Sequence, residues 1–379
     1  MKILFVSLPS IHAVRWIENL SETSHELYWF DVYQRGSLNT DIEIKQFTNW
    51  GKRKLNPIRG EYFLQKRLPS LYEKLQPYLE VTANEKLQEI IEEIKPDIIH
   101  SFNLQTSAYP ILKTLKKYKQ IQWIYSCWGS DLYYYKNIAK ELQKIKKVLL
   151  RVDFLHADCA RDYEIAIQLG YRGEILPVIP GGGGYNLEYY IPFKKHLKER
   201  NVILVKGYEH LFGRALNVVK ALEKIVGDLK DFEVVVFGAH PSVISYINTN
   251  QLPFTYYSRH ELPQEEVLIL MGKSIIYVGN SISDGIPNTL LEAMAMGAFP
   301  IQSNPGSATE ELITQGKNGF LIEQPEDIDA ISKDIIKALE DADLREKAHI
   351  ANKQIALDYL DYHKNQQKII ALYQNIKDA

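Results

Sequence analysis

Two acidic residues flank a possible anion-binding loop in SDGIPNTLLEAMAMG, residues 283–297. Asp284 is the second residue of this stretch, and Glu292 follows within an apolar run. Pro287 suits the first turn of a helix, where a missing N–H costs nothing, and Gly297 suits the end of that helix. The free backbone N–H groups at such a helix start bind anions such as phosphate. Carboxylates on both sides of a phosphate site would suit a sugar at one end and a ribose at the other.

A second interpretation of the same residues is purely structural. Asp284 would then cap the helix, and Glu292 would face solvent ~12 Å further along, at a rise of ~1.5 Å per residue. The residue types leave both interpretations open, so the elements that position the two acids decide between them.

Short β-branched or aromatic runs alternate with helix-length stretches along the whole chain. The predicted strands are residues 3–7, 26–31, 97–101, 122–126, 154–158, 174–179, 202–206, 233–237, 254–257, 275–279, 299–302 and 319–322. Near-continuous apolar strands between helices favour parallel sheets covered on both faces. We therefore predict an α/β protein with two Rossmann-like, doubly wound domains.

The boundary between the domains is expected near residues 185–200, where PGGGGYNLEYYIPFKKHLKER combines glycines, prolines and a run of charge. We predict a first domain over residues 1–195 and a second over residues 196–360. Residues 326–378 are predicted to form a continuous helix, whose last part, residues 361–379, crosses back to the first domain.

Charge is distributed unevenly along the 379 residues. Residues 1–200 carry 29 Lys and Arg against 23 Asp and Glu, and the remainder carries 16 against 24. The excess of positive charge in the first half favours contact with a polyanion or an anionic membrane surface. Basic segments lie there at residues 50–67 and 136–151. One predicted helix face carries Lys136, Lys140, Lys144 and Lys147. A solvated helix face is the alternative for these lysines.

Several function classes are disfavoured by missing motifs. The loop after the first predicted strand contains no G-x-G-x-x-G turn, and no G-x-x-x-x-G-K-[ST] phosphate loop is present, so a dehydrogenase is not expected. No apolar run approaches the roughly 18 to 20 residues of a membrane span, and MKILFVSLPS is too short for a signal peptide. Cys127 and Cys159 lack metal or redox spacing. These features predict a cytoplasmic protein.

The stretch SISDGIPNTLLEAMAMGAFPIQSNPGSATEELITQGKNGFLI, residues 281–322, resembles the donor-site motif of the family 4 retaining glycosyltransferases of GT-B fold. Further similarity lies in residues 11–27, 96–102 and 128–133, and it covers most of the chain in the expected order. The resemblance implies two Rossmann-like domains that face each other across a cleft. It also implies transfer of a sugar from a nucleotide diphosphate sugar, with UDP as the expected nucleotide, to a hydroxyl with retention of configuration.

This resemblance also implies roles for residues of the second domain. Lys206 and Arg214 would clamp the diphosphate, Glu292 would bind the ribose, and Asp284 would meet the sugar. The donor-binding residues are then Lys206, Arg214, Asp284, Gly285, Ile286, Pro287, Asn288, Thr289 and Glu292. In the family the leaving phosphate takes the acceptor proton, so neither a metal nor another cofactor is expected.

In the first domain, Asp131 and His100 are predicted to act in catalysis with Asp284, because both lie near predicted strand ends. For His100, a core or helix-cap role is the alternative. The predicted acceptor-side residues are His12, Arg15 and Trp128. The sequence departs from the family pattern at Asp284, where Glu is usual, and at Trp128, where many relatives have His.

The expected partners are a nucleotide-sugar donor, a glycan or lipid-linked acceptor and an anionic membrane surface, without nucleic acid. We expect a role in surface polysaccharide synthesis, at the inner face of the membrane. Two alternatives are a non-catalytic nucleotide-sugar or glycan-binding protein of this fold and a nucleotide-sugar epimerase. The intact acid–Gly–Pro–LLEA motif argues against the epimerase.

Overall fold

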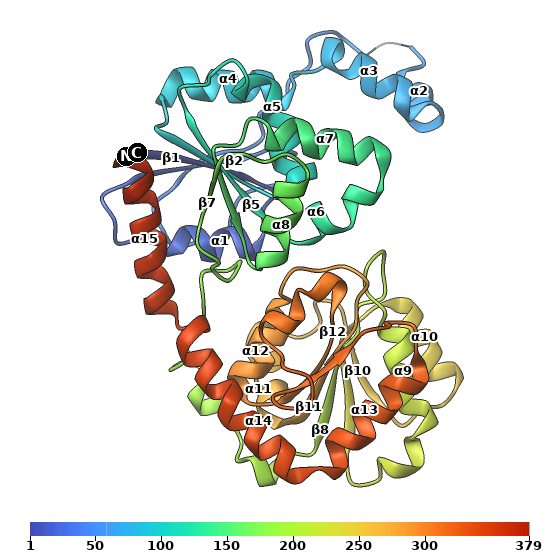
Figure 1. The fold of residues 1–379 in the computed structure, drawn as a ribbon. Helices are drawn as coiled ribbons and strands as arrows, with labels where there is room; N and C mark the ends of the chain where they lie inside the picture. Colours follow the sequence, from blue (N-terminus) through green and yellow to red (C-terminus); the bar gives the residue numbers. More distant parts are fainter. Residues whose placement is uncertain (58, 379) are drawn as a thin grey trace.

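The computed structural model describes residues 1–57 and 59–378 and contains two parallel sheets, each with helices on both faces (Figure 1). The first sheet has the strand order β3-β2-β1-β4-β5-β6-β7. Its strands are β1 (Lys2–Ser7), β2 (Glu26–Asp31), β3 (Lys45–Phe47), β4 (Ile98–Phe102), β5 (Gln122–Cys127), β6 (Phe154–Ala157) and β7 (Glu174–Ile175). The helices of this domain are α1 (Ile11–Glu18), α2 (Glu61–Arg67), α3 (Pro69–Leu79), α4 (Ala83–Ile94), α5 (Tyr109–Leu115), α6 (Ser130–Tyr133), α7 (Ala139–Leu149) and α8 (Ala160–Gln168).

The second sheet has the order β10-β9-β8-β11-β12-β13. Its strands are β8 (Val202–Lys206), β9 (Glu233–Ala239), β10 (Thr255–Ser258), β11 (Ser274–Gly279), β12 (Phe299–Ser303) and β13 (Phe320–Ile322). The helices that follow in sequence are α9 (Ala215–Lys224), α10 (Pro241–Thr249), α11 (Gln264–Lys273), α12 (Asn288–Met296), α13 (Ile328–Glu340), α14 (Ala342–Ile355) and α15 (Tyr362–Asp378).

Both sheets are buried on two sides, and their central strands are mostly apolar. On β1, Leu4 and Val6 join one hydrophobic cluster, while Ile3 and Phe5 join the cluster on the opposite face. This alternation follows from the two-residue period of a strand. It confirms the prediction of two doubly wound α/β domains.

The strand order of each sheet reverses direction at one point. In the first sheet the reversal lies between β1 and β4, and in the second it lies between β8 and β11. Loops that leave neighbouring strands on opposite sides of a sheet open a crevice at such a point. The loops after β1, β8 and β11 are therefore placed to form binding sites.

Two strand predictions differ from the structure. The predicted strand at 174–179 stops after β7, because Pro177 and Pro180 lack the N–H that would continue the ladder. The short strand β3 was not predicted, because its three residues contain no β-branched side chain. The other predicted strands match observed ones to within two residues at each end.

The prediction of one continuous helix over residues 326–378 is wrong. Three helices occupy this region, since Asp341 caps the N-terminus of α14 with a bond from the Leu344 N–H (2.8 Å). A short π-helical turn over residues 356–360 then separates α14 from α15. Within the described residues, no helix is long and apolar enough to cross a membrane.

Helix α15 lies against the first domain (Figure 1). Its Tyr373 hydroxyl accepts a hydrogen bond from the Trp16 indole (3.0 Å) and lies 2.5 Å from His100 Nδ1. The two segments that connect the domains lie side by side. The Tyr185 N–H donates to the Leu360 carbonyl, and the Tyr362 N–H donates to the Tyr185 carbonyl.

Candidate active site

A cleft lies between the domains at the carboxyl ends of their strands. It holds a cavity of about 390 Å³, lined on one side by α1 and the loops after β5 and β6. The other side is formed by the end of β8 and the loop between β11 and α12. A second cavity of about 210 Å³ shares Lys206, Tyr208 and Asp284 with the first. The cleft therefore lies where the reversal points of both sheets predict a ligand site.

Asp284 and Glu292 both line this cleft. Glu292 is only 4% exposed and accepts a hydrogen bond from Gln264 (2.9 Å). The N-cap of α12 is Pro287, and Asp284 bonds instead to the Gly285 N–H (3.0 Å). The structural interpretation of the two acids, a helix cap and a solvent-facing carboxylate, is therefore wrong.

The electrostatics of these acids differ from those of surface carboxylates. Burial raises the pKa of Glu292, while the charge of Arg15 and the bond from Gln264 oppose this rise. Burial also raises the pKa of Asp284, against the attraction of Lys206. Both carboxylates thus lie in a desolvated site, where hydrogen bonds and charges act strongly.

The start of α12 offers fewer free N–H groups than the sequence predicted. The Gly285 N–H bonds to Asp284, and the Ile286 N–H bonds to Asp158 (3.3 Å). Asn288 and Thr289 begin the helix, so their N–H groups have no intrahelical acceptor. These two N–H groups and the positive end of the helix dipole favour an anion at this point.

The predicted basic pair is split by the structure. Lys206 ends β8 and lines both cavities, with its ammonium 4.9 Å from the centre of the Tyr208 ring. Arg214 lines neither cavity. Its guanidinium donates to the carbonyl of Gly213 (2.8 Å) and lies 3.6 Å from Glu326. Lys206 is therefore the cation of the predicted pair that lines the cleft.

The predicted acceptor-side residues His12, Arg15 and Trp128 all line the cleft. Arg15 lies 3.5 Å from Glu292, and His12 Nδ1 lies 2.8 Å from the Asn288 amide. Burial, helped by the nearby charges of Arg15 and Lys206, lowers the pKa of His12 to about 4. His12 is therefore neutral at pH 7.

Asp158 was not predicted, although it follows β6 and lines the same cleft. One carboxylate oxygen accepts the bond from Ile286, and the other is buried without a hydrogen-bond partner. Burial, followed by the charges of Asp162 and Asp284, raises the pKa of Asp158 well above its usual value. A Cβ atom at Gly285 would collide with this carboxylate, so the loop needs glycine there. In the sequence, the only indication of Asp158 is its position directly after the strand β6, as the last residue of the tripeptide 156–158.

His100 does not line the cleft. Its ring is fully buried, and Nε2 lies 2.7 Å from the Ser126 hydroxyl while Nδ1 faces Tyr373. Burial lowers the pKa of His100 well below its usual value. The core role that the sequence left open fits these contacts, and we no longer assign His100 to catalysis.

Asp131 is also fully buried and lies outside the cleft. Its carboxylate accepts bonds from the N–H groups of Leu104 (3.0 Å) and Trp128 (2.9 Å) and from the Tyr125 hydroxyl (2.6 Å). Such a carboxylate has little capacity left for a substrate. We therefore assign Asp131 to holding the loop that presents Trp128, in place of the predicted catalytic role.

Within the described part of the chain, one group of three side chains has the spacing of metal ligands: Asp158, Cys159 and Asp162. Asp162 already pairs with Arg161 (2.8 Å), and burial raises the pKa of the Cys159 thiol far above its usual value. Because a thiol binds metal as the thiolate, this group does not favour a metal ion. Metal-independent activity remains a prediction.

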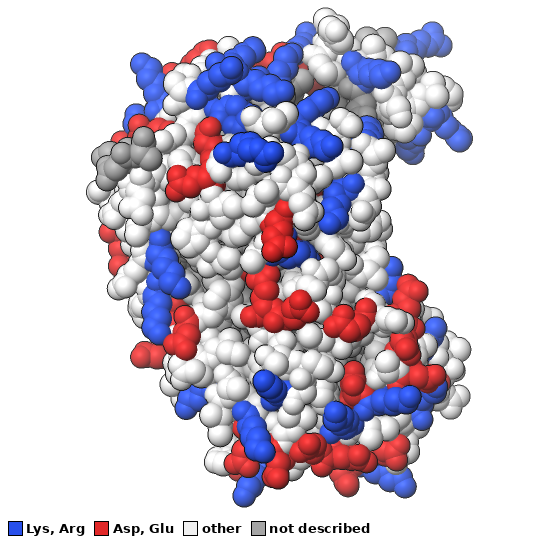
Figure 2. All heavy atoms as spheres, viewed as in Figure 1, with Lys and Arg blue, Asp and Glu red and all other residues white. Residues whose placement is uncertain are grey.

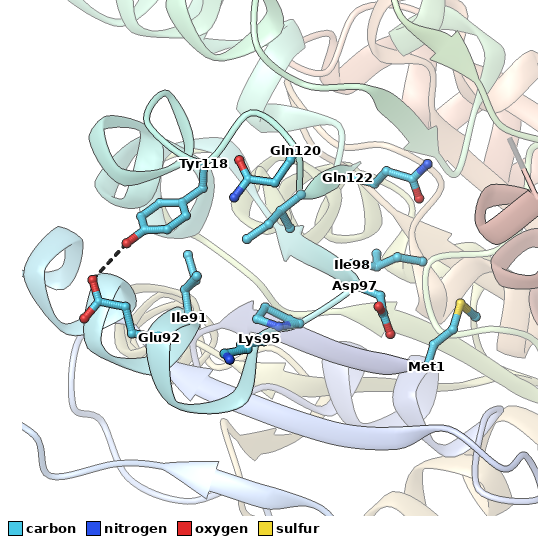
Figure 3. Close-up of a pocket in the computed structure, with 11 residues that line it drawn as sticks. Met1, Ile91, Glu92, Lys95, Asp97, Ile98, Tyr118, Gln120 and Gln122 are labelled. Atoms are coloured by element: carbon cyan, nitrogen blue, oxygen red, sulfur yellow. Dashed lines mark hydrogen bonds between the residues drawn. The ribbon is translucent and has the colours of Figure 1, made fainter.

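A larger cavity of about 670 Å³ lies at the opposite, amino ends of β4 and β5 (Figure 3). Its rim carries Tyr118, which donates a hydrogen bond to Glu92 (3.0 Å), and the single cationic side chain of Lys95. No helix N-terminus lies among the lining residues, and the two acids of this cavity, Glu92 and Asp97, already accept hydrogen bonds from Tyr118 and the Lys2 N–H. Its chemistry therefore suits a donor diphosphate less well than that of the cleft, despite its volume.

Two family models match the chain and together span most of it. Residues 2–161 match the model described as glycosyl transferase 4-like, and residues 192–355 match the model described as glycosyl transferases group 1. The chain belongs to the GT-B glycosyltransferases of the family 4, group 1 type. No curated protein sequence matches the chain.

Solved structures of low sequence identity share this GT-B fold. Sucrose-phosphate synthase from Thermosynechococcus elongatus aligns with a TM-score of 0.72 at 14% identity, over 99% of both chains. HepE from Anabaena, in complex with UDP and glucose, aligns with a TM-score of 0.70 at 15% identity, over 99% of this chain and 100% of its own. The lipopolysaccharide outer core galactosyltransferase WaaB aligns with a TM-score of 0.66 at 16% identity, over 98% and 100%.

Proposed function

We propose that this glycosyltransferase transfers a sugar from a UDP-sugar to a hydroxyl of a glycan or lipid-linked glycan, with retention of configuration and without a metal ion. The observation that carries the proposal is the convergence of Asp284, Glu292 and Lys206 on one cleft at the N-terminus of α12. With the donor bound in this cleft, Glu292 would accept hydrogen bonds from the ribose hydroxyls, and Asp284 would accept them from the hydroxyls of the transferred sugar.

The diphosphate would lie between the Lys206 ammonium and the first N–H groups of α12. These groups would stabilise the negative charge that grows on the leaving nucleotide. The bond between the anomeric carbon and the phosphate oxygen breaks, and the acceptor oxygen bonds to that carbon on the same face of the sugar. The acceptor proton passes to the leaving phosphate oxygen. This proton transfer needs no protein base, which is consistent with the buried positions of His100 and Asp131.

UDP is supported by the HepE complex with UDP and glucose, and a role in surface glycan synthesis is supported by the fold shared with WaaB. The family resemblance supports retention. We place the reaction in the cytoplasm, at the inner face of the membrane.

The proposal is tested by measuring nucleoside diphosphate release from UDP-, GDP- and ADP-sugars by the wild-type protein and by Glu292→Ala. We expect slow hydrolysis of a UDP-sugar that is lost in the variant and is accelerated by glycan or lipid-linked acceptors. Donor binding without release, even with acceptors present, would instead identify a non-catalytic binding protein. Interconversion of the sugar without its transfer would identify an epimerase.

A further inference from the structure

Helices α2 and α3 form a hairpin that stands out from the first domain (Figure 1). Large apolar side chains of this hairpin are exposed. Leu71, Leu75 and Tyr78 recur at helical spacing, so they form one stripe along α3, and Tyr78 is 72% exposed. The adjacent α2 adds Tyr62 and Phe63, which are 67% and 62% exposed. Contiguous apolar surface of this kind marks an interaction site.

This apolar stripe belongs to one face of α3 only. Tyr72 and Leu79, on another face of the helix, are buried. The base of the hairpin is held by Arg53, which forms ion pairs with Glu61 (2.8 Å) and Glu80 (3.4 Å). The helices are thus anchored by some of their residues while the stripe remains exposed.

The hairpin is also strongly basic. Residues 52–79 contain seven Lys or Arg and two Glu. Figure 2 shows basic side chains on the projecting lobe and over the adjoining top of the domain. Among the described side chains, no salt bridge engages five of these cations: Lys52, Arg59, Lys66, Arg67 and Lys74.

A basic groove runs beside the hairpin. It has a volume of about 630 Å³, lies between α3 and helices α4 and α5, and has Tyr78 at its edge. The cations that line it are Lys54, Lys74, Lys113 and Lys117. Lys54 is paired with Glu85, whereas no described carboxylate forms a salt bridge with Lys113 or Lys117. Cationic groups therefore lie directly beside the apolar stripe.

The lysine-rich helix α7, the other basic segment of this domain, lacks such a stripe. Its apolar residues Ile145, Val148 and Leu149 are buried in the core, and Lys144 is paired with Glu141 (2.7 Å). Exposed apolar side chains flank this helix only at its two ends, Ile138 and Leu150, and do not form a stripe beside the lysines.

We propose that the α2–α3 hairpin and its basic groove form the docking surface for an anionic lipid bilayer. Apolar side chains on one face of a helix enter the boundary between headgroups and acyl chains, while neighbouring lysines and arginines lie at the level of the lipid phosphates. The charge of the hairpin selects a bilayer over an apolar protein partner. This inference is independent of the proposed donor site, because the hairpin lines neither cavity of the cleft.

The test is flotation of the full-length protein with phosphatidylcholine vesicles that contain or lack phosphatidylglycerol. We expect binding to the anionic vesicles at least roughly tenfold stronger than to the neutral ones, and weakened by salt. Lys66→Glu/Arg67→Glu/Lys74→Glu should lower the partition coefficient roughly a hundredfold. Leu71→Ser/Leu75→Ser/Tyr78→Ser should lower it at least roughly tenfold.

The matched control is Lys140→Glu/Lys146→Glu/Lys147→Glu, which makes the same charge change on α7. It should lower partitioning less than the hairpin variant does, and UDP affinity and thermal unfolding show whether each variant is folded. Equal losses from both charge variants, or no anionic-vesicle binding by wild type, would overturn the proposal. It would also be overturned if wild type were a dimer that the apolar-stripe variant converts to a monomer, since a second copy would then cover the surface.

Discussion

Glu292 is bonded to Gln264 and lies 3.5 Å from Arg15 across the cleft. A ribose that enters this cleft would offer two hydroxyls to the same carboxylate, so Arg15 and the nucleotide compete for it. The predicted spacing of Asp284 and Glu292 identified this site. Asp158 could not be found in the same way, because its contact with Ile286 depends on how the two domains pack.

Replacement of Glu292 by Gln should weaken UDP binding. Hydrogen bonds to a charged group contribute about 1.5–3 kcal/mol, so the dissociation constant should rise roughly 10- to 100-fold. Calorimetric titration with UDP measures this change. Glu346→Gln, an exposed change on α14, serves as the control and should leave the affinity unaltered. Equal affinities for wild type and Glu292→Gln would remove Glu292 from the donor site.

The lowered pKa of His12 predicts that the stability of the protein depends on pH. Its pKa is about 4 in the folded protein against 6.5 in the unfolded chain, so the unfolded state binds a proton first as the pH falls. Stability contributed by neutral His12 is therefore present at pH 7 and is lost between about pH 6.5 and 4. Between pH 7 and 4.5, the free energy of urea unfolding should fall by about 2 kcal/mol more in wild type than in His12→Gln. Parallel pH profiles for the two proteins would contradict this.

At the scale of elements, the apolar runs located nearly all strands, because buried parallel strands are apolar on both faces. The breaks among α13, α14 and α15 were missed because the sequence pattern is helical across all three helices. Only Asp341, the N-cap of α14, marks the first break. The roles of His100 and Asp131 were missed for another reason. His100 lies within β4 and Asp131 lies just after β5, but their side chains turn inward, toward Tyr373 and Tyr125.

Tyr373 should be important for the attachment of α15. Tyr373→Phe removes the hydroxyl that meets Trp16 and His100, and leaves both buried groups without this partner. We expect the free energy of unfolding to fall by about 1–3 kcal/mol, with faster amide hydrogen exchange along α15. Tyr362→Phe, near the start of the same helix, should change stability by less than about 0.5 kcal/mol. The same small effect from Tyr373→Phe would mean that α15 is held by apolar packing alone.

At the scale of the whole molecule, several contacts close the cleft. Ser283 donates to the Ser130 hydroxyl (2.9 Å), His12 meets Asn288, and Glu311 accepts bonds from the N–H groups of Ala160 (2.9 Å) and Arg161 (3.1 Å). Glu311 thereby places a carboxylate of the second domain at the N-terminus of α8 in the first. A negative charge is favourable at that end of a helix.

Glu311→Gln should loosen this closure. The exposed carboxylate is screened by solvent, so we expect a modest effect: a roughly two- to fivefold higher KM for the donor and a larger radius of gyration by X-ray scattering. Glu310→Gln, which alters a carboxylate bonded within the second domain, is the control. If Glu311→Gln and Glu310→Gln gave the same KM and scattering, the α8 contact would have no part in closure.

The proposed donor site places a nucleoside diphosphate at the N-terminus of α12, between the two domains. The most direct measurement is a crystal structure of the protein with UDP. We predict ribose hydroxyls within hydrogen-bonding distance of Glu292 and the diphosphate between Lys206 and the N–H groups of Asn288 and Thr289. UDP bound elsewhere, such as in the cavity beside Tyr118 and Lys95, with the cleft empty, would rule out this donor site.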